Sequence, residues 1–233
     1  MKKFFVVSDI HGMYREFKGL LQHWDREDTL VILGDMVDRG PDSLKVIQKV
    51  IELKKQHKVI VIRGNHDQMF LDFLYNPYDY ENFMHNGGRS TLDSFKTGNK
   101  TPVNYDPIVS TINKFYKYEV EFLKKSLFYY QHGKLLFTHA GFQSLYADWR
   151  MTTDNDFVWI RDHYKHPNNS GSINIFGHTP TQIIHGKDHN GVWISKCETY
   201  IGIDGACAYG GQLNGLHIQE DGKILGAYKQ EKM

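Results

Sequence analysis

The segment ILGDMVDRGPDS, residues 32–43, places two carboxylates and a guanidinium directly after a run of apolar residues. Asp35 and Asp38 are three positions apart, and Arg39 follows the second of them. Carboxylate oxygens bind cations, and the planar fork of an arginine matches the oxygens of a phosphate group. Because Gly, Asp and Pro are also ordinary turn residues, the default interpretation of a single segment of this kind is an exposed turn. The rest of the sequence has to decide between these readings.

Residues that bind metals or transfer protons follow five separate apolar runs of the chain. Ligands of open α/β sheets bind at the carboxyl ends of the strands, so we expect these residues to share one edge of a sheet. One shared site explains the pattern better than five unrelated turns that happen to carry such residues. The residues are Asp9 and His11, then Asp35, Asp38 and Arg39, then Asn65, His66 and Asp67, then His139, and finally His178.

These side chains favour a site for two divalent metal ions. They supply oxygen and nitrogen donors without a thiolate, a set that suits Mn, Fe or Zn. Positions i and i+2 of an extended chain face the same side, so we expect Asp9 and His11 to grip one ion. Asp35 has two carboxylate oxygens and would bridge both ions, which at about 3.5–4 Å apart can clamp a phosphoryl displacement. The second ion would be held by Asn65, His139 and His178.

Three residues remain for the substrate and the proton. Arg39 is a fixed cation that we expect to clamp the phosphate, and Asn65 should contact the phosphate as well as the metal. His66, next to a metal ligand, is placed to protonate the leaving alkoxide. Asp38 would hold the other nitrogen of the His66 ring and so fix its tautomer.

The order of the predicted elements indicates the α/β class. The first third of the chain alternates strands and helices, which predicts a parallel sheet covered by helices. Residues from about 75 to 125 are predicted to form a helical insertion, and the chain from Ser126 onward reads as short strands separated by Gly, Asn and Asp. We therefore expect residues 1–233 to form a single domain of two packed sheets with flanking helices. The predicted elements of the first third are strands at 3–7, 29–33 and 58–62 and helices at 13–24, 42–56 and 66–74.

Composition narrows the range of partners and compartments. A formal net charge of +1 and 24% charged residues give no basic excess, so we expect no nucleic-acid partner. No apolar stretch approaches the roughly 20 residues of a membrane helix, so no membrane association is expected. Cys197 and Cys207 form no disulfide framework, and we expect a reducing, cytoplasmic location. Of the 13 histidines, we expect those outside the five motifs, including His163, to be mostly at the surface or half-buried.

Five motifs in order resemble those of the calcineurin-like metallophosphoesterases, within them the phosphoprotein phosphatases. The resemblance extends from Ser8 to about Leu216. It implies a two-sheet α/β sandwich, a two-metal centre that often contains manganese, and direct hydrolysis of phosphate esters by a metal-bound hydroxide. The motifs are SDIHG (8–12), GDMVDRG (34–40), RGNHD (63–67), THAG (138–141) and FGHTP (176–180).

Two further segments resemble the bacterial and phage members of this group. VWIRD (158–162) is similar to a segment whose arginine binds phosphate, which makes Arg161 a second candidate for the phosphate clamp. IGIDGACAYGGQLNGL (201–216) is similar to the closing strands of bacterial protein phosphatases and of symmetrical diadenosine tetraphosphate hydrolases. Ser8 and Asp67 depart from the family's usual Gly and Glu, and we place both beside the ligands rather than among them.

The sequence therefore favours a metal-dependent phosphatase that acts on phosphomonoesters, foremost phosphoserine and phosphothreonine of proteins and also phosphotyrosine. One alternative is hydrolysis of dinucleoside polyphosphates such as diadenosine tetraphosphate, since the closing motif and the Tyr-rich insertion are compatible with it. The other is a catalytically silent binding module on the same scaffold. The expected partner is a phosphorylated protein or a small phosphoester, and no oligomeric state is predicted.

Overall fold

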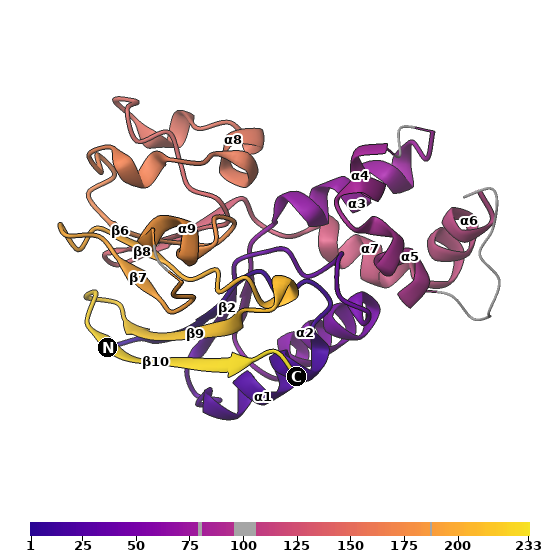
Figure 1. Ribbon diagram of the computed structural model, residues 1–233, viewed down its shortest axis with the longest axis horizontal. Coiled ribbons are helices and arrows are strands. Elements are labelled where there is room, and N and C mark those ends of the chain that lie inside the picture. Colours follow the sequence, from indigo (N-terminus) through magenta and orange to yellow (C-terminus); the bar gives the residue numbers. More distant parts are fainter. Residues whose placement is uncertain (79–80, 96–105, 187) are drawn as a thin grey trace.

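The computed structural model describes residues 1–78, 81–95, 106–186 and 188–233. Two five-stranded sheets form its centre, and helices flank them (Figure 1). This arrangement confirms the predicted α/β sandwich. The first sheet has the order β10 (Ile224–Glu231), β9 (Gln212–Gln219), β1 (Lys3–Val7), β2 (Thr29–Ile32) and β3 (Val59–Val61), and the second has the order β4 (Tyr129–His132), β5 (Leu135–Thr138), β6 (Ile173–Phe176), β8 (Tyr200–Gly202) and β7 (Trp193–Ile194).

The first sheet is parallel on one side and antiparallel on the other, whereas the second has a parallel centre and antiparallel edges. In the first sheet, β1, β2 and β3 pair in parallel, while β9 and β10 run antiparallel to their neighbours. In the second sheet, β5, β6 and β8 pair in parallel, while β4 and β7 are antiparallel edges. The carboxyl ends of the parallel strands therefore carry the predicted motifs, as expected for this class.

Alternating side chains of β1 separate two layers of the core. Phe4 and Val6 point into the cluster between the two sheets, whereas Phe5 and Val7 point into the cluster beneath the helices. This is the two-residue period of a strand, and it explains why the central strands read as continuous apolar runs. The helices that cover the first sheet are α1 (Tyr14–Leu20) with the short 3-10 helix Leu21–His23, α2 (Ser43–Gln56) and α3 (Asn65–Tyr75).

The predicted insertion contains four helices in its described part. They are α4 (Glu81–His85), α5 (Gly88–Ser94), α6 (Asp106–Phe115) and α7 (Lys117–Lys124). Part of the predicted range, residues 79–80 and 96–105, lies outside the described residues. Between α6 and α7 the helix is interrupted at Tyr116, whose backbone leaves the helical conformation. Buried Phe83, Leu92 and Leu123 join the insertion to the core beneath α2 and α3.

Short elements connect the strands of the second sheet. They are α8 (Asp154–Trp159), α9 (Thr181–His185) and the 3-10 helices Trp149–Met151 and His163–Lys165, while the 3-10 helix Cys207–Tyr209 links β8 to β9 of the first sheet. His163 is buried, contrary to the expectation for the histidines outside the motifs, because it packs among the rings of Phe176 and Tyr200. Within the described ranges, no helix has the length and apolar character required to cross a membrane.

Candidate active site

The five motifs meet between the two sheets rather than along one of them. Three follow β1, β2 and β3 of the first sheet, and the other two follow β5 and β6 of the second. The expectation of one shared sheet edge is therefore wrong, although the residues do gather as expected. Hydrogen bonds join the two halves: the His178 amide donates to Oδ2 of Asp9 at 3.0 Å, and Nδ1 of His139 lies 2.7 Å from the Leu33 carbonyl oxygen.

The backbone of the site is largely left-handed, which non-glycine residues rarely adopt. Asp9 and His11 have φ angles of 52° and 46°, so they do not lie on an extended chain as the sequence suggested. After β1 ends, the chain turns and pairs with the loop after β2, where the His11 amide donates to the Asp35 carbonyl at 2.8 Å. This turn brings Oδ1 of Asp9 to 4.0 Å from Nε2 of His11. Positive φ angles also occur at Asp35, Asp38, Arg39 and His178.

Glycines allow the loops after β2 and β3 to come into close contact. Gly34 has a φ of 90°, and a Cβ atom there would lie 2.3 Å from the Gly64 amide nitrogen. A Cβ atom at Gly64 would in turn lie 2.0 Å from Oδ1 of Asp35. Side chains at either position would push the Asp35 carboxylate away from its neighbours.

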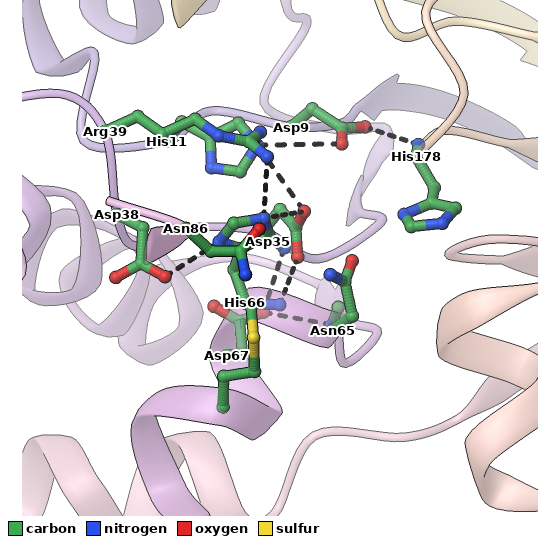
Figure 2. A network of polar contacts seen from close by, with 12 residues as sticks. Asp9, His11, Asp35, Asp38, Arg39, Asn65, His66, Asp67, Asn86 and His178 are labelled. Carbon is green, nitrogen blue, oxygen red and sulfur yellow. Dashed lines mark hydrogen bonds and ion pairs between the residues drawn. The ribbon is translucent and has the colours of Figure 1, made fainter. Parts of the chain in front are cut away.

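Asp35 lies at the centre of the site, and its two oxygens face different histidines. Oδ2 lies 3.5 Å from Nε2 of His11, and Oδ1 lies 3.5 Å from Nε2 of His139. The amide of His66 also donates to Oδ1 at 2.9 Å (Figure 2). A carboxylate divided in this way has the arrangement required to bridge two cations.

The donor atoms on both sides of Asp35 fit metal ions. Asp35 belongs to two groups of side chains whose ligand atoms lie within 4.8 Å of one another, one with His11 and His66 and the other with His139 and His178. Nε2 of His139 lies 3.0 Å from Oδ1 of Asn65. With Nδ1–H of His139 directed at the Leu33 carbonyl, Nε2 and the amide oxygen are both acceptors, and a cation would relieve their repulsion.

An unpartnered nitrogen supports the same interpretation. Nε2 of His178 is buried, and within the described part of the chain it has no hydrogen-bond partner. Burial lowers the pKa of His11, His139 and His178, so their rings are neutral and available as ligands. Burial also raises the pKa of Asp35 to about 7, an effect that a bound cation would oppose.

Asp67 holds the backbone around the bridging carboxylate, a role that sequence reasoning missed. Its carboxylate accepts the amides of Asp35 at 2.9 Å, Met36 at 3.0 Å and Gly64 at 3.1 Å. It is the third residue of α3, where an acidic side chain commonly reaches back to the amide before the helix. That position in the first helical turn was the available signal.

His66 contacts Asp38 as the sequence predicted. Nδ1 of His66 lies 2.7 Å from Oδ2 of Asp38 in a fully buried pair. Thr91 of α5 also binds Asp38, because its hydroxyl donates to Oδ1 at 2.6 Å and accepts the Asp38 amide at 2.8 Å. The sequence offered no signal for Thr91, since 53 residues separate it from its partner.

Arg39 lies over the histidines of the first group. Its guanidinium donates to Nε2 of His66 at 2.8 Å and contacts Nε2 of His11 (Figure 2). The exposed Tyr209 ring covers the guanidinium on another side, with its centroid 4.7 Å from Cζ. Arg39 is therefore held by neutral rings and has no carboxylate partner within hydrogen-bonding distance among the described residues, which leaves its charge available to an anion.

Arg161 lies beside the second group. Its guanidinium donates to the His178 carbonyl oxygen at 3.2 Å and lies 3.4 Å from the Thr179 hydroxyl. The structure thus brings all of the predicted site residues together around Asp35. It also adds Asp204, a buried residue after β8 whose pKa is raised by burial and by the charge of Asp9. The strand-end position of Asp204 in IGIDG was a signal that sequence reasoning did not use.

Comparison with known proteins agrees with this geometry. The family model described as calcineurin-like phosphoesterase matches residues 2–218, so the chain belongs to the calcineurin-like phosphoesterases. Membership of this family and the names of its relatives make the protein a hydrolase, which sets aside a catalytically silent module.

The relatives in sequence are named as tetraphosphatases. The asymmetrical bis(5'-nucleosyl)-tetraphosphatase PrpE of Anoxybacillus flavithermus is 29% identical over 92% of this chain and 90% of its own length. PrpE of Bacillus subtilis is 28% identical with the same coverage. A symmetrical bis(5'-nucleosyl)-tetraphosphatase of Buchnera aphidicola is 53% identical, but over only 27% of this chain and 23% of that protein.

Solved structures share the fold at low sequence identity. The crystal structure of a putative diadenosine tetraphosphatase matches all of this chain and 94% of its own, with a TM-score of 0.66 and 16% identity. A cold-active protein tyrosine phosphatase matches all of this chain and 79% of its own, with a TM-score of 0.64 and 17% identity. Both similarities concern the fold alone.

Proposed function

We propose that this protein is a two-metal phosphohydrolase whose substrates are dinucleoside polyphosphates. The observation that carries the metal-dependent chemistry is the division of the Asp35 carboxylate between His11 and His139. The names of relatives that cover most of the chain support the choice of substrate. This choice differs from the phosphoprotein favoured by the sequence, which becomes the second candidate.

The ligands of the proposed ions divide into two sets that share Asp35. When bound, two divalent ions would supply Lewis-acid activation of water and of the phosphoryl group. Manganese is proposed, with iron and zinc as the other candidates for this donor set. The first set is Asp9, His11 and Asp35, and the second is Asp35, Asn65, His139 and His178.

Side chains of the protein bind the substrate and supply the proton. Arg39, Asn65 and Arg161 would bind the oxygens of the reacting phosphate. Nε2 of His66 accepts a hydrogen bond from the Arg39 guanidinium. A phosphate that binds this guanidinium would free Nε2. Nε2 of His66 takes a proton from solvent once Arg39 has left it. Water then adds to phosphorus and releases a proton to solvent, the bond to the leaving oxygen breaks, and Nε2 of His66 gives its proton to that oxygen. Asp38 keeps the ring oriented through Nδ1.

The second candidate is a phosphatase for phosphoserine or phosphothreonine, with phosphotyrosine also included. The His66–Asp38 pair favours it, because an alkoxide is a poor leaving group that requires a proton donor. A nucleotide leaves through a phosphate oxygen of low pKa and therefore depends less on a proton donor. Turnover of diadenosine tetraphosphate and of a phosphoserine peptide by one enzyme preparation decides between the candidates, and faster turnover of the peptide would make the phosphoprotein the preferred substrate.

Metal dependence tests the chemistry common to both candidates. Exhaustive chelation should abolish turnover, and manganese should restore it. Asp35→Asn should lower turnover by roughly a hundredfold or more and reduce the number of bound ions, since it weakens a ligand shared by both. Full turnover by a sample shown to be metal-free by elemental analysis would contradict the proposal. The matched control is Asp28→Asn, which changes a carboxylate that pairs with His217 and does not belong to the site around Asp35.

A further inference from the structure

A hollow beside Arg161 has no role in the chemistry around Asp35. Its volume is about 430 Å³, within the range of about 300–1,000 Å³ typical of small-molecule pockets. Apolar and aromatic side chains form most of its wall, and Arg161 and Thr179 stand where it adjoins the active site. The wall includes Arg161, Tyr164, Thr179, Ile183, Ile184 and Trp193.

Two residues of the hollow, Arg161 and Thr179, adjoin the second group of metal-type ligands. Thr179 follows His178 directly, and Arg161 donates to the His178 carbonyl oxygen at 3.2 Å. The charge of Arg161 also contributes to the lowered pKa of His139 and His178. A group attached to a phosphate held at Arg161 would therefore enter this hollow.

The walls suit a flat apolar ring. Tyr164 is half-buried and stacks against Phe176, with ring centroids 5.7 Å apart and planes inclined by 10°. Trp193 meets Tyr164 edge to face at 5.4 Å, which fixes both rings. Ile183 is 66% exposed, an unusual state for a large aliphatic side chain beside an active site. Contact with an aromatic ligand would contribute the most binding free energy on apolar and aromatic surfaces of this kind.

The charges at the rim do not oppose an anionic substrate. Lys165 pairs with Asp162 at 2.7 Å, so the two cancel, and Arg161 has no carboxylate partner within ion-pairing distance among the residues described. The arrangement thus combines one cation for a phosphate with an apolar wall for the group that the phosphate carries.

We propose that this hollow binds the nucleobase of the substrate while Arg161, together with Arg39 and Asn65, contacts the phosphate. The inference rests on the proposed function, because it names the part of a dinucleoside polyphosphate that gives binding beyond the phosphates. Tyr164 and Ile183 are then specificity-determining residues. They touch the base and leave the reacting phosphate to the residues around Asp35.

Calorimetric binding to the manganese-loaded protein tests the inference without turnover. Adenosine monophosphate and ribose 5-phosphate share a phosphate and a sugar, and only the first carries a base. The ratio of the two affinities, adenosine monophosphate over ribose 5-phosphate, should be about ten, a typical effect of one base–aromatic stack. Tyr164→Leu, which keeps an apolar side chain, and Ile183→Gln, at an exposed site, should each reduce this ratio several-fold.

Control variants separate this site from others. Ile194→Gln changes an exposed isoleucine outside the hollow and should leave the ratio unchanged. Equal binding of the two ligands by the wild-type protein would overturn the inference, as would an unchanged ratio in both hollow variants. Loss of the ratio in Tyr209→Leu instead would place the base beside Arg39 and also overturn it. Failure of the proposed function is a different result, namely no metal-dependent turnover of dinucleoside polyphosphates.

Discussion

Nδ1 of His66 and Oδ2 of Asp38 lie 2.7 Å apart in a pair that is almost completely buried. The pair fixes which nitrogen of the ring faces Asp38 and directs Nε2 toward Arg39 and the space beside Asp35. A ring held in this way can deliver a proton in one direction only. Changing either residue should therefore slow the reaction most for substrates whose leaving group requires a proton.

His66→Asn should lose most of its rate on a phosphoserine peptide and much less on p-nitrophenyl phosphate. A general acid contributes about 10²- to 10⁴-fold, and a nitrophenolate leaves without that help. Steady-state rates on both substrates measure the difference, with metal content determined alongside, because a lost ion would slow both alike. Equal losses at full metal occupancy would exclude the acid role.

Thr91→Val should weaken the same function indirectly and cost stability. The change removes a hydroxyl that binds Asp38 twice, leaving a buried carboxylate oxygen and amide with fewer partners. We expect a loss of about 1–3 kcal/mol in the free energy of unfolding and a several-fold loss of rate that is larger for phosphoserine. Thr111→Val, in another helix of the insertion, is the matched control. A loss of stability without leaving-group selectivity would show that Thr91 acts only in packing.

Arg39→Ala should weaken inhibition by inorganic phosphate and slow turnover together. A charge-assisted hydrogen bond contributes about 1.5–3 kcal/mol, so the inhibition constant should rise roughly 10- to 100-fold. Arg26→Ala, at an exposed arginine stacked on Trp24, should leave inhibition unchanged. An unaltered inhibition constant for the Arg39 variant would remove this residue from the phosphate clamp.

His163 should make the fold sensitive to acid. Burial lowers its pKa to about 4, while its ordinary value in an unfolded chain is about 6.5. Between these values the unfolded chain binds more protons, so stability is full above pH 6.5 and decreases as the pH falls toward 4. The contribution lost at pH 5 is about 2 kcal/mol.

Chemical denaturation at pH 7 and pH 5 measures this contribution. His163→Gln should be less stable at pH 7, because a ring packed against Phe176 is lost, yet its stability should change less between the two pH values. His166→Gln, at an exposed histidine, should behave as the wild type. Identical pH dependence of His163→Gln and the wild-type protein would mean that other groups cause the acid sensitivity.

The composition of the site was predictable because each motif follows a strand. Apolar runs identify the strands, and the rule that sites form at the carboxyl ends of parallel strands brings Asp9, Asp35 and Asn65 of the first sheet together without any knowledge of packing. The pairing of Asp38 with His66 was predictable for a related reason. A histidine that transfers protons requires a partner at its second nitrogen, and Asp38 lies on the same turn as the predicted bridging ligand Asp35.

The remaining features depend on information that local sequence does not contain. Asp9 and His11 have left-handed backbones because their turn pairs with the loop after β2, a contact between distant segments. Thr91 reaches Asp38 only through the packing of α5 against α2, and the division of the motifs between two sheets follows from strand order. Burial of His163 likewise reflects the aromatic layer outside the second sheet.

The division of the ligands between the two sheets links metal binding to the stability of the fold. The second proposed ion would be held by Asp35 and Asn65, which follow strands of the first sheet, and by His139 and His178, which follow strands of the second, so it would link the two sheets across the apolar layer between them. A ligand bound only by the native state at a hundred times its dissociation constant adds about 2.7 kcal/mol of stability. Supply of divalent metal would then contribute to the stability of the contact between the two sheets, as well as to the rate of turnover.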